Sequence, residues 1–313
     1  MSITREDVEQ AATRIGAHVR RTPLAVIEAG AFGTPGPLAL KLEHLQHTGS
    51  FKARGAFNRV LAARERGELT PVGVVAASGG NAGLAVAYAA ATVGAAAEVF
   101  VPATAPAVKV ARLAALGATV RQVGREYVDA YEAARERADA GGALFCHAYD
   151  QAEICAGQGT LALELTEQAP DVDTVLVGGG GGLMAGVAAA LEGRARVVGV
   201  EPTSIPTLHR ALAAGEPVDV AVSGVAADSL GARRLGDIAF DVAARCGVQS
   251  VLVSDDEIVA ARRRLWQDCR LVVEHGAATA LAALLEGAYQ PASGESVAVV
   301  LCGANTDPCD LAG

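Results

Sequence analysis

Residues 173–183 read DTVLVGGGGGL, an apolar run followed by five glycines and the first residue of a helical pattern. A short run rich in valine and leucine predicts a buried strand, and the glycines allow a tight turn from that strand into the helix. Packing alone does not justify five adjacent glycines, because each one costs backbone entropy. They expose a row of backbone N–H groups at a helix start, which suits a dianionic phosphate. The sequence therefore predicts a phosphate cradle formed by Gly178, Gly179, Gly180, Gly181 and Gly182.

Apolar runs and helical patterns alternate on both sides of this segment. The runs that predict strands are residues 72–77, 97–101, 118–123, 173–177, 196–201, 249–254 and 296–301. The helical patterns between them include residues 108–116, 126–138, 158–167 and 255–267, and Ser254 with Glu257 predicts a capping box at the start of the last one. Strands that alternate with helices are typical of a parallel sheet covered on both faces. The predicted fold class is therefore α/β.

The composition limits the partners of the chain. Its 313 residues are 51% hydrophobic and carry a formal net charge of −9, which argues against a nucleic-acid-binding surface. The six cysteines lie far apart without a Cys-x-x-Cys pair, so they predict neither a zinc site nor disulfides, and we expect a cytoplasmic location. Acidic residues near the start argue against a signal peptide, and the uncharged stretch 82–97 is too short to span a membrane. The expected partner is a small molecule.

Lys52, one of only three lysines, lies in the string HTGSFKARGA at residues 47–56, between a predicted strand and a predicted helix. Burial and the positive end of a helix both disfavour the ammonium form of a lysine, so Lys52 is suited to act as an amine nucleophile and later as a base. The alternative is an ordinary lysine whose charge reaches the surface. Lys52 alone leaves both interpretations open.

Two further segments follow predicted strands. The segment SGGNAG, at residues 78–83, combines glycines that let a ligand approach the backbone with donors suited to a carboxylate. The segment LCGAN, at residues 301–305, places Cys302 at the carboxyl end of the last strand, where ligands of parallel sheets gather. A thiol there can face a neutral ring nitrogen without protonating it. The alternatives are an ordinary tight turn and a small buried cysteine.

The glycine run also fits a second kind of phosphate. Gly180, Gly182 and Ala185 match the GxGxxA dinucleotide pattern, and Glu201 ends the next predicted strand, where an acid that binds ribose would lie. An NAD-dependent oxidoreductase is therefore an alternative. It leaves HTGSFK and SGGNAG unexplained.

With these segments in this order, the chain resembles the fold type II pyridoxal-phosphate enzymes of the serine/threonine dehydratase and serine racemase family. The similarity covers nearly the whole length and includes KLEHLQHTGSFKARGA, SGGNAGLAVAYAA, GQGT, GGGGGL, VGVEP and LCGAN. It implies a two-domain α/β fold of the tryptophan synthase β type. Residues 1–72 and 150–313 would form a large cofactor-binding domain, and residues 73–149 a small substrate-binding domain. It also implies a homodimer.

The resemblance assigns roles to individual residues. It implies pyridoxal 5′-phosphate as cofactor, with Lys52 as the catalytic residue that forms a Schiff base with it. Phe51 and Asn81 would flank the cofactor ring and its 3-hydroxyl, the five glycines would hold its phosphate, and Cys302 would face its pyridine nitrogen. The substrate carboxylate would bind the loop formed by Ser78, Gly79, Gly80, Asn81 and Ala82.

The implied activity is that of an ammonia-lyase that converts L-threonine, L-serine or a related β-hydroxy amino acid to a 2-oxo acid and ammonia. Racemases of the family carry a serine as acid and base where this chain has Gly79, so efficient racemisation is not expected. Glu201 matches one carboxylate of the family's cation site but Thr207 replaces the other, so no metal is expected. Serine racemase, β-replacement, and dehydration of 3-hydroxyaspartate or phenylserine remain alternatives, as does a non-catalytic amino-acid-binding protein.

Overall fold

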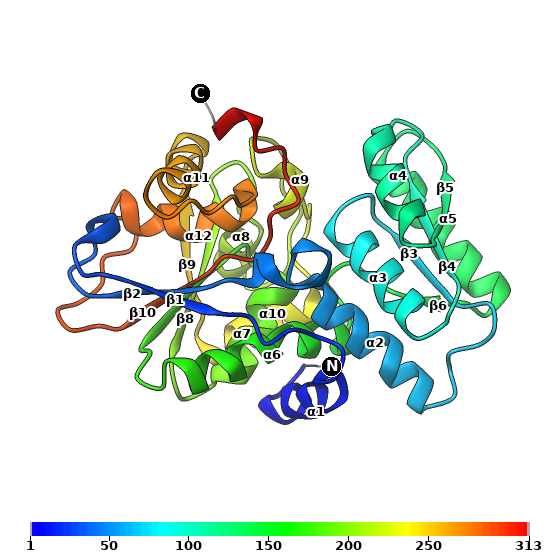
Figure 1. Cartoon of the computed structure of the whole chain (residues 1–313), viewed down its shortest axis with the longest axis horizontal. Coiled ribbons are helices and arrows are strands. Elements are labelled where there is room, and N and C mark those ends of the chain that lie inside the picture. Colours follow the sequence, from blue (N-terminus) through cyan, green and yellow to red (C-terminus); the bar gives the residue numbers. More distant parts are fainter. Residues whose placement is uncertain (1, 312–313) are drawn as a thin grey trace.

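The computed structural model describes residues 2–311, within which the strands form one sheet of six and one of four (Figure 1). The larger sheet has the order β1-β2-β10-β7-β8-β9 and consists of β1 Leu24–Ile27, β2 Leu38–Lys41, β10 Val297–Val300, β7 Thr174–Gly178, β8 Arg196–Pro202 and β9 Gln249–Val253. The smaller sheet has the order β5-β4-β3-β6 and consists of β5 Thr119–Gln122, β4 Ala97–Val101, β3 Val74–Ala77 and β6 Leu144–Phe145. Every neighbouring pair is parallel except β1 with β2. The predicted α/β class with parallel-rich sheets is confirmed.

Helices cover the larger sheet on both faces (Figure 1). One group packs together on one face and comprises α1 Arg5–Ile15, α6 Ala152–Gln168, α7 Gly182–Leu191 and α10 Asp237–Cys246. The opposite face carries α11 Asp255–Cys269 and α12 His275–Leu285. Two shorter helices are α8 Thr207–Ala214 and α9 Ala227–Leu230, and 3-10 turns occur at Ala31–Gly33, Glu43–Leu45, His47–Gly49 and Cys309–Leu311. Among residues 2–311, none of the helices combines the length and apolar character that crossing a bilayer requires.

The smaller sheet also has helices on both faces, namely α3 Asn81–Thr92, α4 Ala107–Ala115 and α5 Tyr127–Gly141. The side chains of β3 alternate between the faces. Val74 and Ala76 pack in one core cluster with α3, while Val75 and Ala77 pack in another with α5. Because both faces of the strand are buried, its sequence reads as a continuous apolar run and not as an alternating one.

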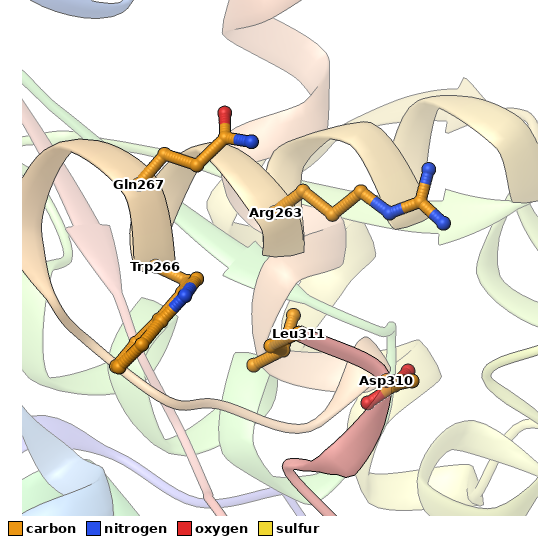
Figure 2. A pocket seen from close by; sticks show the side chains of 5 residues that line it. All are labelled: Arg263, Trp266, Gln267, Asp310 and Leu311. Carbon is orange, nitrogen blue, oxygen red and sulfur yellow. The ribbon is translucent and has the colours of Figure 1, made fainter. Parts of the chain in front are cut away.

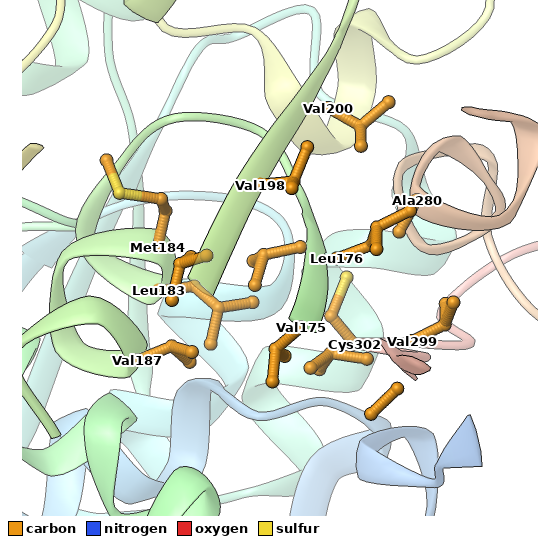
Figure 3. Packing of buried hydrophobic residues seen from close by; sticks show 14 of the residues in the cluster. Val175, Leu176, Leu183, Met184, Val187, Val198, Val200, Ala280, Val299 and Cys302 are labelled. Carbon is orange, nitrogen blue, oxygen red and sulfur yellow. The ribbon is translucent and has the colours of Figure 1, made fainter. Parts of the chain in front are cut away.

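The centre of the larger core lies where β7 meets α7 (Figure 3). Val175, Leu176 and Val177 of β7 are fully buried, and so is every side chain of α7 apart from Leu183, which is 5% exposed. Helix α7 is apolar all round because it is covered on all sides. This burial fixes the end of β7 and the start of α7, between which the glycine run lies.

Helix α6 separates two other helices at close range. A Cβ atom added at Gly157 would lie 2.6 Å from the carbonyl oxygen of Arg54 in α2, the helix Lys52–Glu65. A Cβ atom added at Gly159 would lie 2.4 Å from the carbonyl oxygen of Gly186 in α7. Glycine is therefore required on α6 at both contacts. Helix α2 packs against α6 on one side and α3 on the other, so it connects the parts of the molecule built on the two sheets.

The strands predicted from apolar runs are all present within one or two residues, and the predicted capping box at Ser254 and Glu257 is confirmed. Three strands were not predicted, namely β1, β2 and β6. Strand β6 has only two residues, and β1 is partly exposed at the edge of the sheet, so neither produces a long apolar run.

Candidate active site

Lys52 is the first residue of α2, and its position depends on a distant part of the chain. Ser50 forms an isolated bridge with Gly303, and the backbone N–H of Phe51 donates to the carbonyl oxygen of Cys302 at 3.0 Å. These contacts place the start of α2 beside the loop that follows β10. The segments HTGSFK and LCGAN, about 250 residues apart in sequence, are therefore neighbours in the fold.

The amine of Lys52 has little free space beside it. Its Nζ atom donates to the carbonyl oxygen of Ala148 at 2.6 Å. The free cavity beside it has a volume of only about 10 Å³ and is lined by Lys52, Ala56, Ala82, Val86, His147, Ala148, Ile154 and Gln158. Burial lowers the pKa of Lys52 to about 8, although Cys155, Cys302 and Glu274 act in the opposite direction. A large share of this amine is therefore unprotonated just above neutral pH.

The glycine run spans the end of β7 and the start of α7. Gly179 has a φ of 85°, which favours glycine, and a Cβ atom at Gly178, Gly180 or Gly182 would lie within 2.4 Å of a neighbouring atom. Packing therefore requires glycine at these three positions, contrary to the expectation from the sequence. Gly181 differs, because the nearest atom to its Cβ position is Cβ of Tyr149 at 4.0 Å. The space at Gly181 is open.

The loop that contains Asn81 contacts two residues of the larger part of the molecule. The Nδ2 atom of Asn81 donates to both carboxylate oxygens of Glu274, at 2.8 and 3.0 Å, and its Oδ1 atom accepts a hydrogen bond from Asn305 at 2.6 Å. Burial raises the pKa of Glu274, against the lowering effect of Asn81. In the same loop, the hydroxyl of Ser78 accepts a hydrogen bond from the backbone of Gly80 at 3.2 Å.

Glu274 was not singled out from the sequence. It is 7% exposed and directly precedes α12 in the run LVVEHGAATALAALL. A single acid at the start of an apolar helix was the available signal, and it resembles an ordinary helix N-terminus. Its partner Asn81 lies 193 positions away, so no local pattern joins the two.

Cys302 is 3% exposed and lies two residues after the end of β10. Burial raises the pKa of its thiol, and the charge of Glu274 raises it further. Cys302 is therefore neutral at physiological pH. Figure 3 shows its sulfur atom among the apolar side chains around β7.

Glu201 lies at the end of β8, but its carboxylate is bound to groups of the protein itself. It accepts hydrogen bonds from the hydroxyl of Thr207 at 2.7 Å and from the backbone N–H groups of Leu208 and His209 at 2.9 and 3.0 Å. The side chain is 1% exposed. Because these donors belong to the first turn of α8, Glu201 serves as its cap and is not free to bind a ribose. The dinucleotide alternative loses the acid on which it depended.

A family model described as "Pyridoxal-phosphate dependent enzyme" matches residues 15–303. The chain belongs to the pyridoxal-phosphate dependent enzymes. The resemblance seen in the sequence is thereby confirmed, and pyridoxal phosphate is the cofactor of this family.

Several individual proteins and solved structures resemble this chain. An L-threonine ammonia-lyase of Thermotoga maritima is 36% identical over 309 residues, which are 97% of this chain and 76% of that protein. A phenylserine dehydratase of Ralstonia pickettii is 38% identical over 276 residues, which are 87% of this chain and 84% of that protein. The structure of maize serine racemase superposes with a TM-score of 0.90 at 30% identity and covers 99% of this chain and 96% of its own.

The residues around Lys52 fit a pyridoxal phosphate. The chain supplies a desolvated amine, a helix start at the glycine run with open space at Gly181, and a neutral thiol. Within residues 2–311, both polar atoms of the Gln158 side chain and the hydroxyl of Ser50 are buried without a hydrogen-bond partner. Unpaired buried polar atoms are costly, and Gln158 lines the cavity beside Lys52, so its two unpaired atoms indicate a polar occupant there.

A larger cavity than the one beside Lys52 lies elsewhere. It has a volume of about 340 Å³ and is lined by Arg263, Trp266, Gln267, Asp310 and Leu311, between α11 and the last turn of the chain (Figure 2). None of the predicted site residues lines it. Asp310 is already paired with Arg262. The larger of these two cavities is therefore not the one beside Lys52.

Proposed function

We propose that this protein is a pyridoxal-phosphate dependent ammonia-lyase that converts L-threonine or L-serine to a 2-oxo acid and ammonia. The observation that carries the proposal is the amine of Lys52, whose pKa is lowered to about 8 at the start of α2. The 36% identity to an L-threonine ammonia-lyase over 97% of the chain supports the choice of reaction.

We propose Lys52 as the residue that holds the cofactor and then removes the α-proton of the substrate. The bound cofactor supplies an electron-withdrawing ring that stabilises negative charge at the substrate α-carbon. Once free, the amine of Lys52 accepts the α-proton at Nζ, and its lowered pKa increases the fraction of that amine that is unprotonated near pH 8.

The remaining predicted roles are proposals that this arrangement supports. The N–H groups of Gly178–Gly182 would hold the phosphate, with its oxygens near the open space at Gly181. Phe51 and Asn81 would flank the ring, and the neutral thiol of Cys302 would leave the ring nitrogen unprotonated. An unprotonated ring is a weaker electron sink, which favours elimination over longer-lived carbanion chemistry.

We propose that the substrate carboxylate binds the loop Ser78–Ala82 at the start of α3, where backbone N–H groups and the helix end favour an anion. The link from Asn81 to Glu274 holds this loop against the larger part of the molecule. Gly79 has no proton to give on the face opposite Lys52, so the proposed enzyme is a dehydratase and a poor racemase.

A phenylserine dehydratase is the second candidate. The 38% identity to the Ralstonia pickettii enzyme supports it. So does the group of aromatic rings near Lys52, in which His147 packs edge-on against Tyr149 with ring centroids 4.6 Å apart. Such a wall suits an aromatic β-substituent.

We further propose the division into a large domain, residues 1–72 and 150–313, and a small domain, residues 73–149. All four strands of the smaller sheet fall between Val74 and Phe145, which supports this division. A homodimer in the cytoplasm is the assembly and location that we propose, by analogy with the family.

The test is a keto-acid release assay with the purified holoenzyme. L-threonine, L-serine, L-phenylserine, 3-hydroxyaspartate and D-serine are compared, and Lys52→Ala serves as the inactive control. We expect the highest kcat/KM with L-threonine or L-serine. A marked preference for phenylserine would select the second candidate, and an active Lys52→Ala variant would refute the assignment of Lys52.

A further inference from the structure

The turn between β6 and α6, residues 147–151, carries the carbonyl group that receives Lys52. The oxygen atom is that of Ala148, 2.6 Å from Nζ of Lys52. A backbone carbonyl has no charge and cannot neutralise an ammonium group as a carboxylate would. How well the Ala148 carbonyl stabilises the amine of Lys52 therefore depends on how firmly the turn holds that carbonyl in place.

His147 holds this turn from within. Its Nδ1 atom accepts hydrogen bonds from the backbone N–H groups of Tyr149 at 3.1 Å and Asp150 at 2.8 Å. An Nδ1 atom that accepts two hydrogen bonds carries no proton, so the ring is neutral with its proton on Nε2. Burial also lowers the pKa of His147 to about 4, which keeps the ring in this form at neutral pH.

Two more side chains fix the same turn. Gln151 accepts a hydrogen bond from the backbone of His147 at 2.9 Å and donates to the carbonyl of Phe145 at 3.2 Å. The thiol of Cys155 donates to the carbonyl of Tyr149 at 3.0 Å. The side chains of His147, Gln151 and Cys155 therefore hold this five-residue turn through hydrogen bonds. The part of the turn that faces the amine is the carbonyl of Ala148.

Few charged groups face this arrangement. Lys52 is faced by Cys155 of α6, by Cys302 after β10 and by Glu274 before α12. His147 is faced by Asp150 in the turn, by Arg135 of α5 and by Lys52 itself. Burial raises the pKa of both thiols, so neither carries charge near neutral pH.

We propose that His147 is a positioning residue, which holds the Ala148 carbonyl where it receives the amine of Lys52 whenever that amine is not joined to the cofactor. This proposal rests on the proposed role of Lys52. A hydrogen bond donated to the carbonyl restricts the direction of the single lone pair on Nζ. When Nζ takes the substrate α-proton, the C–H electron pair stays with the substrate, and the new ammonium group remains bonded to the same oxygen.

The test compares three substitutions of His147. Asparagine places its amide oxygen as many bonds from Cα as Nδ1 and can accept the same two hydrogen bonds. Glutamine places it one bond further out, and phenylalanine keeps the ring but removes the acceptor. His147→Phe and His147→Gln should therefore release the turn, while His147→Asn should hold it.

The first measurement is the pH dependence of acetylation of Lys52 by acetic anhydride in the cofactor-free full-length chain, followed by mass spectrometry. The chain has three lysines, and Lys109 serves as the internal reference. Without a fixed acceptor the ammonium form is less favoured, so we expect the midpoint for Lys52 to fall by about one pH unit in His147→Phe and His147→Gln. In His147→Asn it should stay near the native value.

The second measurement is made on the holoenzyme. We expect His147→Phe to lower kcat by about tenfold with little change in KM, and His147→Asn to recover most of the loss. The substitution Gln151→Leu loosens the same turn from its other side and replaces His147→Phe should that variant fail to fold. It should shift the midpoint in the same direction.

An unchanged or raised midpoint in His147→Phe would overturn the proposal, and so would an Asn variant that behaves like the Phe variant. A raised midpoint would mean that water, and not the carbonyl, solvates the amine. These outcomes are separate from failure of the proposed function, which would appear as absence of keto-acid release by the native holoenzyme while the acetylation results remained as expected.

Discussion

Lys52 and Arg54 lie two residues apart at the start of α2, yet they enter opposite surroundings. Arg54 is fully buried and pairs with two carboxylates, Glu43 at 2.8 Å and Glu164 at 2.7 Å. Burial opposes its charge, but these partners raise its pKa. The amine of Lys52 bonds to a carbonyl oxygen, and burial lowers its pKa.

Two lysines differ in their partners in the same way, although burial lowers the pKa of both. Lys41, at 0% exposed, donates to the carboxylate of Glu164 at 2.7 Å, to Gln168 at 2.9 Å and to the carbonyl of Thr22 at 2.8 Å. A buried cation that stabilises the fold is surrounded by acceptors that include a carboxylate. A buried amine that is to react is left without one. The partners, and not burial alone, separate the structural cation from the reactive one.

The largest effect is expected when the reactive lysine, Lys52, is replaced. Lys52→Ala should lower keto-acid release by about 10³-fold or more, because the general base is gone. The fold should persist, since Lys52 has no carboxylate partner within residues 2–311 that the substitution would strand. Activity is measured together with circular dichroism. A variant that retained a tenth of the native rate would place the base elsewhere.

On the structural side, Arg54→Ala should destabilise the protein by about 3–5 kcal/mol, because the fully buried Glu43 loses its cation and Glu164 keeps only Lys41. Urea unfolding of the cofactor-free chain measures this loss. The matched control is Arg21→Ala, which removes a pair with Glu167 whose side chains are both more than half exposed, and should cost less than about 1 kcal/mol. An equal loss of unfolding free energy in Arg54→Ala and Arg21→Ala would contradict the proposed difference between a buried and an exposed ion pair.

The glycine run gives a sharper test of the reactive side. Gly181→Ala adds a methyl group where the nearest atom is 4.0 Å away, so the unfolding free energy of the cofactor-free chain should change by less than about 1 kcal/mol. Its affinity for pyridoxal phosphate should fall by about tenfold or more, because the methyl group enters the proposed phosphate space.

Gly180→Ala is the matched control for that experiment. Its Cβ atom would lie 2.3 Å from Cβ of Leu208, so this variant should lose about 1–3 kcal/mol of stability even without cofactor. Equilibrium dialysis measures the affinity of each variant and urea unfolding its stability. Unchanged affinity in Gly181→Ala would argue that the phosphate binds elsewhere.

The lowered pKa of Lys52 predicts the pH dependence of turnover. Below pH 8 the free amine is largely protonated and cannot accept a proton, so kcat should rise several-fold as the pH increases toward about 8. The measurement is kcat at saturating substrate between about pH 6 and about 9. A profile that is flat over this range would mean that proton removal by Lys52 does not limit the rate.

The smallest effect concerns metal removal. Glu201 accepts three hydrogen bonds from the start of α8, and residues 2–311 contain no cluster of three or more His, Cys, Asp or Glu side chains that could hold a metal ion. Treatment with a chelator should therefore shift the Tm by less than about 1 °C and leave keto-acid release unchanged. A larger shift that added magnesium or calcium reversed would reveal a cation that contributes to stability.

Much of this site could be predicted because its residues have unusual types or neighbours. Five adjacent glycines and a lysine among small residues are rare enough to be noticed in a sequence. The alternation of apolar runs with helical patterns likewise predicted the central strands, since these are buried on both faces.

The parts that were missed depend on contacts between distant residues. Glu274 gains its role from an asparagine 193 positions away, and Ala148 from a carbonyl oxygen that every residue possesses. The packing need for Gly180 was also hidden, because Leu208 approaches it only after β8 and α8 have formed. Backbone groups and tertiary partners have no signature in the order of residues.

Two glycines of α6 set the distance between Lys52 and the proposed phosphate site. Gly157 sets how closely α6 approaches the helix that carries Lys52, and Gly159 sets how closely it approaches the helix that follows the glycine run. The distance between the amine and the proposed phosphate site therefore depends on the two glycines of α6, which have no side chains and let α2 and α7 pack close to it. A single methyl group at either position would lengthen that gap, and a cofactor of fixed size could then no longer touch both ends.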